Sequence, residues 1–154
     1  NELGSYNTSA GQALEDLKKL LEHKEVGEHL PFLPLFNAAQ VMHAKVEFMD
    51  FGNGSGVRYL TQFDQAPIPI NNFELIYTYQ GLSEDGKCYI SVVLPITHPE
   101  LPESNQVSLD ENFDVERFKT EMAESVMKLN EFSDSSFSPD LTMLDLIIQS
   151  IVIN

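Results

Sequence analysis

Three features of this chain carry residue types that could do chemistry, and the first is a glycine-rich stretch. Residues 52–56 read GNGSG, which is close to a phosphate-binding loop. Such loops need a helix directly after the glycines, because the helix N-terminus must face the phosphate. Here Val57 instead opens a run that is typical of a strand. We therefore interpret residues 52–56 as a hairpin turn.

The second feature is the pair Ser125 and Lys128, which has the S-x-x-K spacing of serine acyl-enzymes. In those enzymes the lysine helps to remove the proton of the nucleophilic serine. The partner motifs of that class, S-x-N and K-T-G, are not evident. The apolar periodicity around Ser125 indicates an ordinary amphipathic helix, so we interpret the pair as a chance match.

The third feature is the set of four histidines, His23, His29, His43 and His98. No two of them are three or four residues apart, so no metal site is encoded on one helix face. His98 leads from a predicted strand into a loop, close to Glu100, and loops often carry functional residues. A hydrolase that uses His98 with such a carboxylate is our alternative hypothesis. Otherwise we predict no catalytic residue, no metal and no cofactor.

A further group of polar and aromatic residues surrounds the proline-containing connector between two predicted hairpins. An arginine among amides and tyrosines could line a ligand groove, since such groups offer oriented hydrogen bonds on an aromatic floor. The candidate ligand-binding residues are Arg58, Gln62, Asn71, Asn72, Tyr77, Tyr79 and His98. The alternative is a structural Arg58 paired with Asp64 or Asp50, and ordinary core tyrosines. Strand register decides between the two interpretations.

Hydrophobic periodicity predicts the elements that must position these residues. The 154 residues suit a single domain, 1–154. Apolar residues at helical spacing predict helices over 10–21, from Asp114 to about 129, and from 138 to 148. Alternation and turn signals predict strands over 41–51, 57–63, 73–80 and 88–96, and a short last strand over 151–153. The predicted fold is α+β: an antiparallel sheet built from two successive hairpins and packed by three helices.

Two details of this prediction can be checked against the structure. Alternation places a set of apolar side chains on one buried face of the sheet. That set is Met42, Val46, Phe48, Leu75, Ile90, Val92 and Leu94. For the last helix, Ser138 is the expected N-cap and Pro139 the expected first helical residue.

Charge and composition exclude several classes of partner. Lys and Arg together number 9 against 24 Asp and Glu, a formal net charge of −15. Nucleic acids and anionic membranes need clustered basic residues, so we expect no nucleic-acid partner. The single cysteine, Cys88, excludes an intramolecular disulfide. There is no run of 18 apolar residues, and we predict no transmembrane segment.

Two stretches of this sequence suggest a family. The two hairpins, the long helix and a last helix running into residues 146–153 (LIIQSIVI, with Ser150-Ile151) resemble the PsbP/Mog1-like fold. Residues 56–63 (GVRYLTQF) and 94–96 (LPI) resemble uncharacterised bacterial exported or lipoprotein domains. This resemblance implies an α/β/α sandwich and an extracytoplasmic module of the cell envelope or a secreted one. It supplies no catalytic residues.

Together these observations predict a non-catalytic binding or interaction module. The ligand is a protein or a small molecule. Because the sequence begins at Asn1 rather than Met, a leader or lipid-anchor segment could have preceded it. The alternative remains the hydrolase built on His98.

Overall fold

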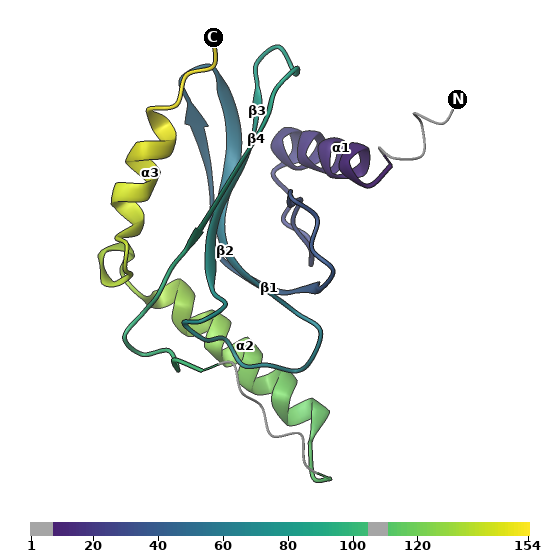
Figure 1. Cartoon of the computed structure of the whole chain (residues 1–154), viewed down its shortest axis with the longest axis vertical. Helices are drawn as coiled ribbons and strands as arrows, with labels where there is room; N and C mark the ends of the chain where they lie inside the picture. Colours follow the sequence, from purple (N-terminus) through teal and green to yellow (C-terminus); the bar gives the residue numbers. More distant parts are fainter. Residues whose placement is uncertain (1–7, 105–110) are drawn as a thin grey trace.

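Four strands follow one another across one antiparallel sheet in the order β1-β2-β3-β4 (Figure 1). The computed structural model describes residues 8–104 and 111–154; residues 1–7 and 105–110 of the predicted domain lie outside it. The strands are β1 (Ala39–Phe51), β2 (Gly54–Asp64), β3 (Ile76–Ser83) and β4 (Tyr89–Pro95). Tight turns join β1 to β2 and β3 to β4, which confirms the α+β class and the two hairpins.

One face of the sheet is covered by α1 (Thr8–His23) and by the segment that follows it. Leu17 of α1 is completely buried and packs with Val57 and Tyr59 of β2. Leu30 and Phe32, from the segment after the helix, complete this smaller core. Figure 1 shows α1 on the opposite side of the sheet from α3. The amphipathic pattern predicted for this helix is therefore confirmed.

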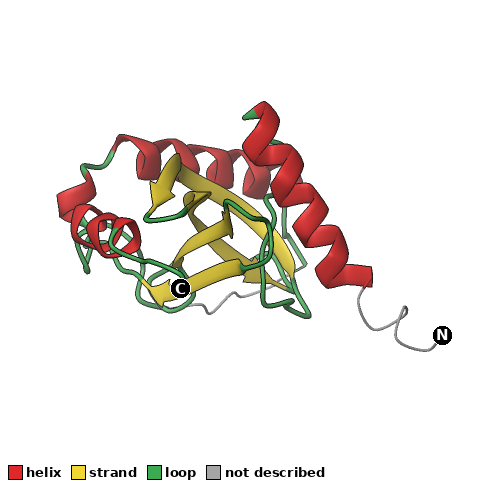
Figure 2. Ribbon diagram, turned by 90° about the horizontal axis from the view of Figure 1, so that it is seen from above, coloured by secondary structure: helices red, strands yellow, loops and turns green. Residues whose placement is uncertain are grey.

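The other face carries the larger core, under α2 (Val115–Glu131) and α3 (Leu141–Gln149). A 3₁₀ turn, η2 (Asp134–Ser136), joins the two helices, and Figure 2 shows helices lying on both sides of the strands. Asp114 caps α2 by accepting a hydrogen bond from the Arg117 N–H, as the acidic helix start predicts. Among the described residues, no helix has both the length and the apolar character needed to cross a membrane.

The prediction that one face holds all the alternating apolar residues of β1 was wrong. Pairing with β2 shifts by one residue between Ala44 and Glu47, and Lys45 there has a positive φ of 54°. This β-bulge inserts an extra residue and reverses the alternation. Met42 therefore packs in the larger core, whereas Val46 and Phe48 pack against the α1 side. The other predicted residues, Leu75, Ile90, Val92 and Leu94, do pack in or against the larger core.

Three predicted boundaries were also wrong. Residues 151–153 form no strand; instead the Gly52 N–H donates to the Ile151 carbonyl beside the first hairpin turn. Strand β3 starts at Ile76, and Phe73 is 74% exposed. Helix α3 starts at Leu141 with Asp140 as its N-cap, because Ser138 pairs with Thr97 in an isolated bridge.

Candidate functional site

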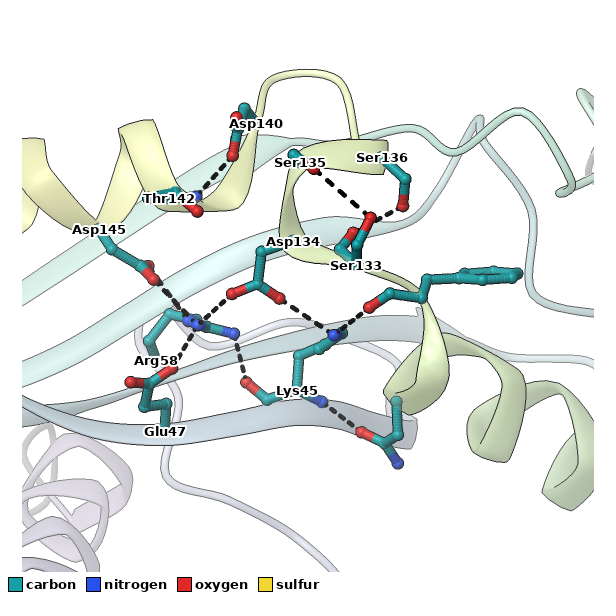
Figure 3. Close-up of polar contacts among 12 residues, drawn as sticks. Lys45, Glu47, Arg58, Ser133, Asp134, Ser135, Ser136, Asp140, Thr142 and Asp145 are labelled. Carbon is teal, nitrogen blue, oxygen red and sulfur yellow. Dashed lines mark hydrogen bonds and ion pairs between the residues drawn. The ribbon is translucent and has the colours of Figure 1, made fainter.

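Arg58 lies at the centre of a charged network that joins β1, β2, η2 and α3 (Figure 3). Its side chain is 1% exposed. The guanidinium donates to Asp145 at 3.1 and 2.9 Å, to Glu47 at 2.6 Å and to the Lys45 carbonyl at 2.7 Å. Asp134 lies 3.5 Å away. The partners of Arg58 are therefore Glu47, Asp134 and Asp145, and not the predicted Asp64 or Asp50.

The bulge at Lys45 positions this network. Because the bulge reverses the alternation, Glu47 comes to the face that Arg58 occupies. The left-handed backbone of Lys45 is held from several sides: its N–H donates to Asn130 Oδ1 at 2.7 Å, and its ammonium lies 3.0 Å from Asp134 and bonds the Phe132 carbonyl. Such a conformation in a non-glycine residue persists only where its surroundings fix it.

Three carboxylates of this network could in principle hold a metal ion. Oxygens of Glu47, Asp134 and Asp145 lie within 4.8 Å of one another. In this structure the Arg58 guanidinium and the Lys45 ammonium lie among them and supply the compensating positive charge. Three carboxylates against two basic side chains leave one net negative charge. Lys45 and Arg58 therefore already compensate most of the charge of these carboxylates.

Tyr77 and Tyr79 lie on the same face of the sheet as Arg58, which settles the register question posed by the sequence. The Tyr77 hydroxyl donates to Asp145 at 2.9 Å, so Arg58 and Tyr77 converge on one carboxylate. Burial, and then the charge of Asp145, raises the pKa of Tyr77, and burial raises that of Tyr79. Tyr79 donates separately to the Met49 carbonyl at 2.8 Å. Both phenols therefore stay protonated donors.

Gln62 and Asn71 belong to a second network, at the base of the connector between β2 and β3. Gln62 Nε2 donates to Asp64 at 2.7 Å, and Gln62 Oε1 accepts from the Asn71 N–H at 3.2 Å. Asn71 Nδ2 donates to Glu74 at 3.0 Å. Burial of Asp64, together with the neighbouring Glu74 carboxylate, raises the pKa of Asp64 to about 6.

Asn72 and His98 form a third contact, away from Arg58. His98 is 4% exposed and stacks on Phe132 at 3.7 Å between ring centroids. Its Nδ1 accepts from the Glu100 N–H at 3.2 Å, so the neutral ring carries its proton on Nε2, which lies 2.9 Å from Ser136 Oγ. Asn72 bonds the His98 main chain at 2.9 and 3.0 Å.

This arrangement determines what His98 can do. A histidine that activates a serine must accept the serine proton, whereas His98 Nε2 donates and Ser136 Oγ itself donates to the Ser133 carbonyl at 2.6 Å. Burial lowers the pKa of His98, with Glu100 opposing the shift. The geometry gives the hydrolase hypothesis no support.

Sequence reasoning missed an apolar groove beside α2. This groove, called the α2 groove below, has a volume of about 630 Å³. It is lined by Glu28, Gln40, Val41, Met42, His43, Ala66, Pro67, Ile68, Phe118, Lys119, Met122, Ala123 and Val126. None of the seven candidate residues is in this lining. The sequence signal that could have predicted the groove was the long apolar stripe of α2. That stripe was interpreted only as part of the buried core.

Six of the seven candidate residues thus fall into three separate hydrogen-bonded networks. The seventh, Tyr79, donates to the Met49 carbonyl instead. Across the described residues, every buried side-chain polar atom has a hydrogen-bond partner. A ligand role for these residues stays a prediction. No protein-family model, no curated protein and no solved structure matches this chain.

Proposed function

We propose that this protein is a non-catalytic binding module that holds a flexible aliphatic chain with an anionic head in the α2 groove. The observation that carries the proposal is the groove itself. Its volume of about 630 Å³ falls within the range of roughly 300–1,000 Å³ that small-molecule sites occupy. Four separate segments supply its walls: the segment after α1, which contributes Glu28, then β1, the connector between β2 and β3, and α2.

The lining favours an aliphatic ligand over a polar one. Two of its polar side chains are already bonded within the protein: Gln40 exchanges hydrogen bonds with the main chain of Leu30, and His43 Nε2 lies 2.9 Å from the Gly27 carbonyl. A polar ligand group would therefore lose hydrogen bonds with water and find few in return.

The apolar part of the lining favours a flexible chain over a flat ring. Met42 of β1 and Met122 of α2 both line the groove, and methionine side chains adapt to irregular shapes. Phe118 supplies the one phenyl ring in the lining. A linear acyl chain can follow such a surface, whereas a planar ligand gains little stacking from it.

Lys119 supplies the charge that selects an anionic head. It lies in the groove lining and pairs with Glu116 at 3.3 Å, but both side chains are largely exposed. Exposed pairs of this kind contribute little free energy, so a ligand carboxylate can displace Glu116 at small cost. Acyl chains with a carboxylate meet both requirements of the groove.

The test is a titration of the full chain with a fluorescent fatty acid. Ala123 is exposed and lines the groove, so Ala123→Phe fills the groove without disturbing the core. We expect its affinity to fall at least about tenfold, because overpacking costs ~1–3 kcal/mol. Met127→Phe is the matched control, since Met127 is exposed on the same helix outside the groove lining.

Lys119→Ala tests the head-group assignment. This variant should weaken the fatty acid and leave its methyl ester unchanged, because only the acid carries a charge for Lys119. Absence of saturable binding, or equal binding by Ala123→Phe and the parent, would overturn the proposal.

An extracytoplasmic setting is part of the same proposal. It is supported by the likeness of residues 56–63 and 94–96 to bacterial exported and lipoprotein domains. Fractionation of the source cells, followed by detection with an antibody, tests it. Recovery in the cytoplasmic fraction would contradict it.

A further inference from the structure

The two edges of the sheet are protected very differently. Edge strand β1 carries two register shifts and charged side chains such as Lys45 and Glu47, which are devices that prevent pairing with another chain. Neighbouring segments also bond its backbone or the turn beyond it, through Asn130 and the Ile151 carbonyl. Edge strand β4 reads YISVVLP and has no charged residue.

Strand β4 is apolar on both faces yet nowhere fully buried. Each of its seven residues keeps intermediate or high exposure, whereas the central strands β2 and β3 are buried almost throughout. Ile90, Val92 and Leu94 point to the larger core, and Tyr89 and Val93 point to the α1 side. Over residues 8–104 and 111–154, only β3 pairs with β4. The apolar side chains on both faces of the sheet therefore extend as far as β4, whose outer edge pairs with no other described strand.

The hydrogen bonds at the ends of β4 show which of its backbone groups are unused by β3. The Cys88 carbonyl accepts from Ser83, and the Ile96 N–H donates to Leu75. Because backbone groups alternate in direction along a strand, the even-numbered residues bond β3. The N–H and C=O groups of Tyr89, Ser91 and Val93 point outward.

We propose that the β4 edge binds the β4 edge of a second copy of this chain in antiparallel register, with Ser91 opposite Ser91. In that register Tyr89 lies opposite Val93 of the other copy, and the three outward residues of each chain can exchange six backbone hydrogen bonds, two per facing pair. Pro95 occupies the next outward position and has no N–H, so the ladder ends there. The two sheets become one.

Side chains and charge identify a second copy as the occupant. The strand is self-complementary in this register, because Ile90 faces Val92 across the join on one side and Tyr89 faces Val93 on the other; apolar pairs of this kind stabilise sheets. In a chain of net charge −15, most surfaces of two copies repel each other. An uncharged edge lets two copies meet without placing like charges opposite one another.

A charge-pair experiment on the full chain tests the proposal. Analytical ultracentrifugation should show the 17.3 kDa monomer converting to a species of twice that mass as concentration rises. Ser91→Lys and Ser91→Glu each place two like charges at the two-fold axis and should stay monomeric. Mixing the two variants should restore the dimer. Gln149→Lys and Gln149→Glu, exposed on α3, are controls that should dimerise like the parent.

Hydrogen exchange on the unmodified chain gives a second measurement that needs no variant, because Ser91 also bonds Gln80 and Leu33 and its replacement lowers stability. The amides of Tyr89, Ser91 and Val93 should gain protection with concentration, while those of Ile90, Val92 and Leu94 stay protected throughout. A monomer at every concentration, or a dimer that both Ser91 variants retain, would overturn the proposal. Constant fast exchange of the three outward amides would do the same.

Discussion

Arg58 and Asp145 stand 87 residues apart in the chain and meet in a two-pronged ion pair, with nitrogen–oxygen distances of 3.1 and 2.9 Å. The pair fastens α3 to the centre of the sheet. Geometry of this kind gives both strength and direction to the contact. Because the Arg58 side chain is 1% exposed and that of Asp145 is 13% exposed, removing either partner leaves the other charge in a poorly hydrated place.

The first prediction follows from this pair. Arg58→Ala should lower the free energy of unfolding by about 3–5 kcal/mol, because Asp145 loses the positive charge that compensates it. Asp145→Ala should cost less, because Arg58 keeps Glu47 and Asp134 as partners. The double variant should cost clearly less than both losses combined, because the two residues act as one unit. Urea denaturation measures all three. Arg117→Ala is the control, since Arg117 pairs with Glu121 on an exposed helix face and should cost under about 1 kcal/mol.

The second prediction concerns pH and the carboxyl pair Asp64 and Glu74. The folded pKa of Asp64, about 6, lies above its ordinary value, so the folded state binds more protons than the unfolded state between about pH 4 and 6. The stability contributed by protonation of Asp64 is complete at the acidic end of this window. It is lost as the pH rises through 6.

Replacement of Asp64 by asparagine removes this titration. Asp64→Asn should therefore gain stability relative to the parent as the pH rises from 4 to 7, as measured by urea midpoints across that range. Glu124→Gln, on the exposed side of α2, should keep the pH profile of the parent. Parallel profiles for Asp64→Asn and the parent would show that the pKa of Asp64 is not raised in the folded protein.

The third prediction concerns Gly56, which lies under the ring of Tyr79. A Cβ atom at Gly56 would come within 2.5 Å of the Gln80 carbonyl and of the tyrosine ring. Gly56→Ala should therefore destabilise the protein by ~1–3 kcal/mol through overpacking. Gly11→Ala is the matched control: it meets nothing within 4 Å in α1 and should stabilise by roughly 0.5–1 kcal/mol. Thermal melts of equal midpoint for the two variants would contradict this reasoning.

The fourth prediction tests the docking of α1. Leu17→Ala should cost roughly 2–4 kcal/mol, because Leu17 is fully buried and truncation leaves a cavity between the helix and β2. Leu146→Ala makes the same truncation on a residue that is 61% exposed and should change the denaturation midpoint little. A loss below ~0.5 kcal/mol for Leu17→Ala would mean that the helix is not tightly packed.

The sequence predicted part of the arrangement around Arg58, but it did not predict the contacts there. Arg58, Gln62 and the two tyrosines were expected to share a region, and they do share a face. Their partners come from elsewhere: Asp134 and Asp145 approach Arg58 from the carboxy-terminal elements. The spacing of residues within one segment does not show which distant segments pack against it. The α2 groove was missed for the same reason, since its walls come from four segments.

The sequence by itself determined the parts of this protein that depend on neighbouring residues. The hairpin turns, the start of α2 at Asp114 and the buried stripe with Leu17 were all predicted, because turn chemistry, capping and helical spacing are local. Only the tertiary structure decided which face of the sheet each β1 residue occupies. The bulge at Lys45 is held by Asn130, Asp134 and Arg58, so a one-residue shift in register depends on contacts that form only when distant elements pack together.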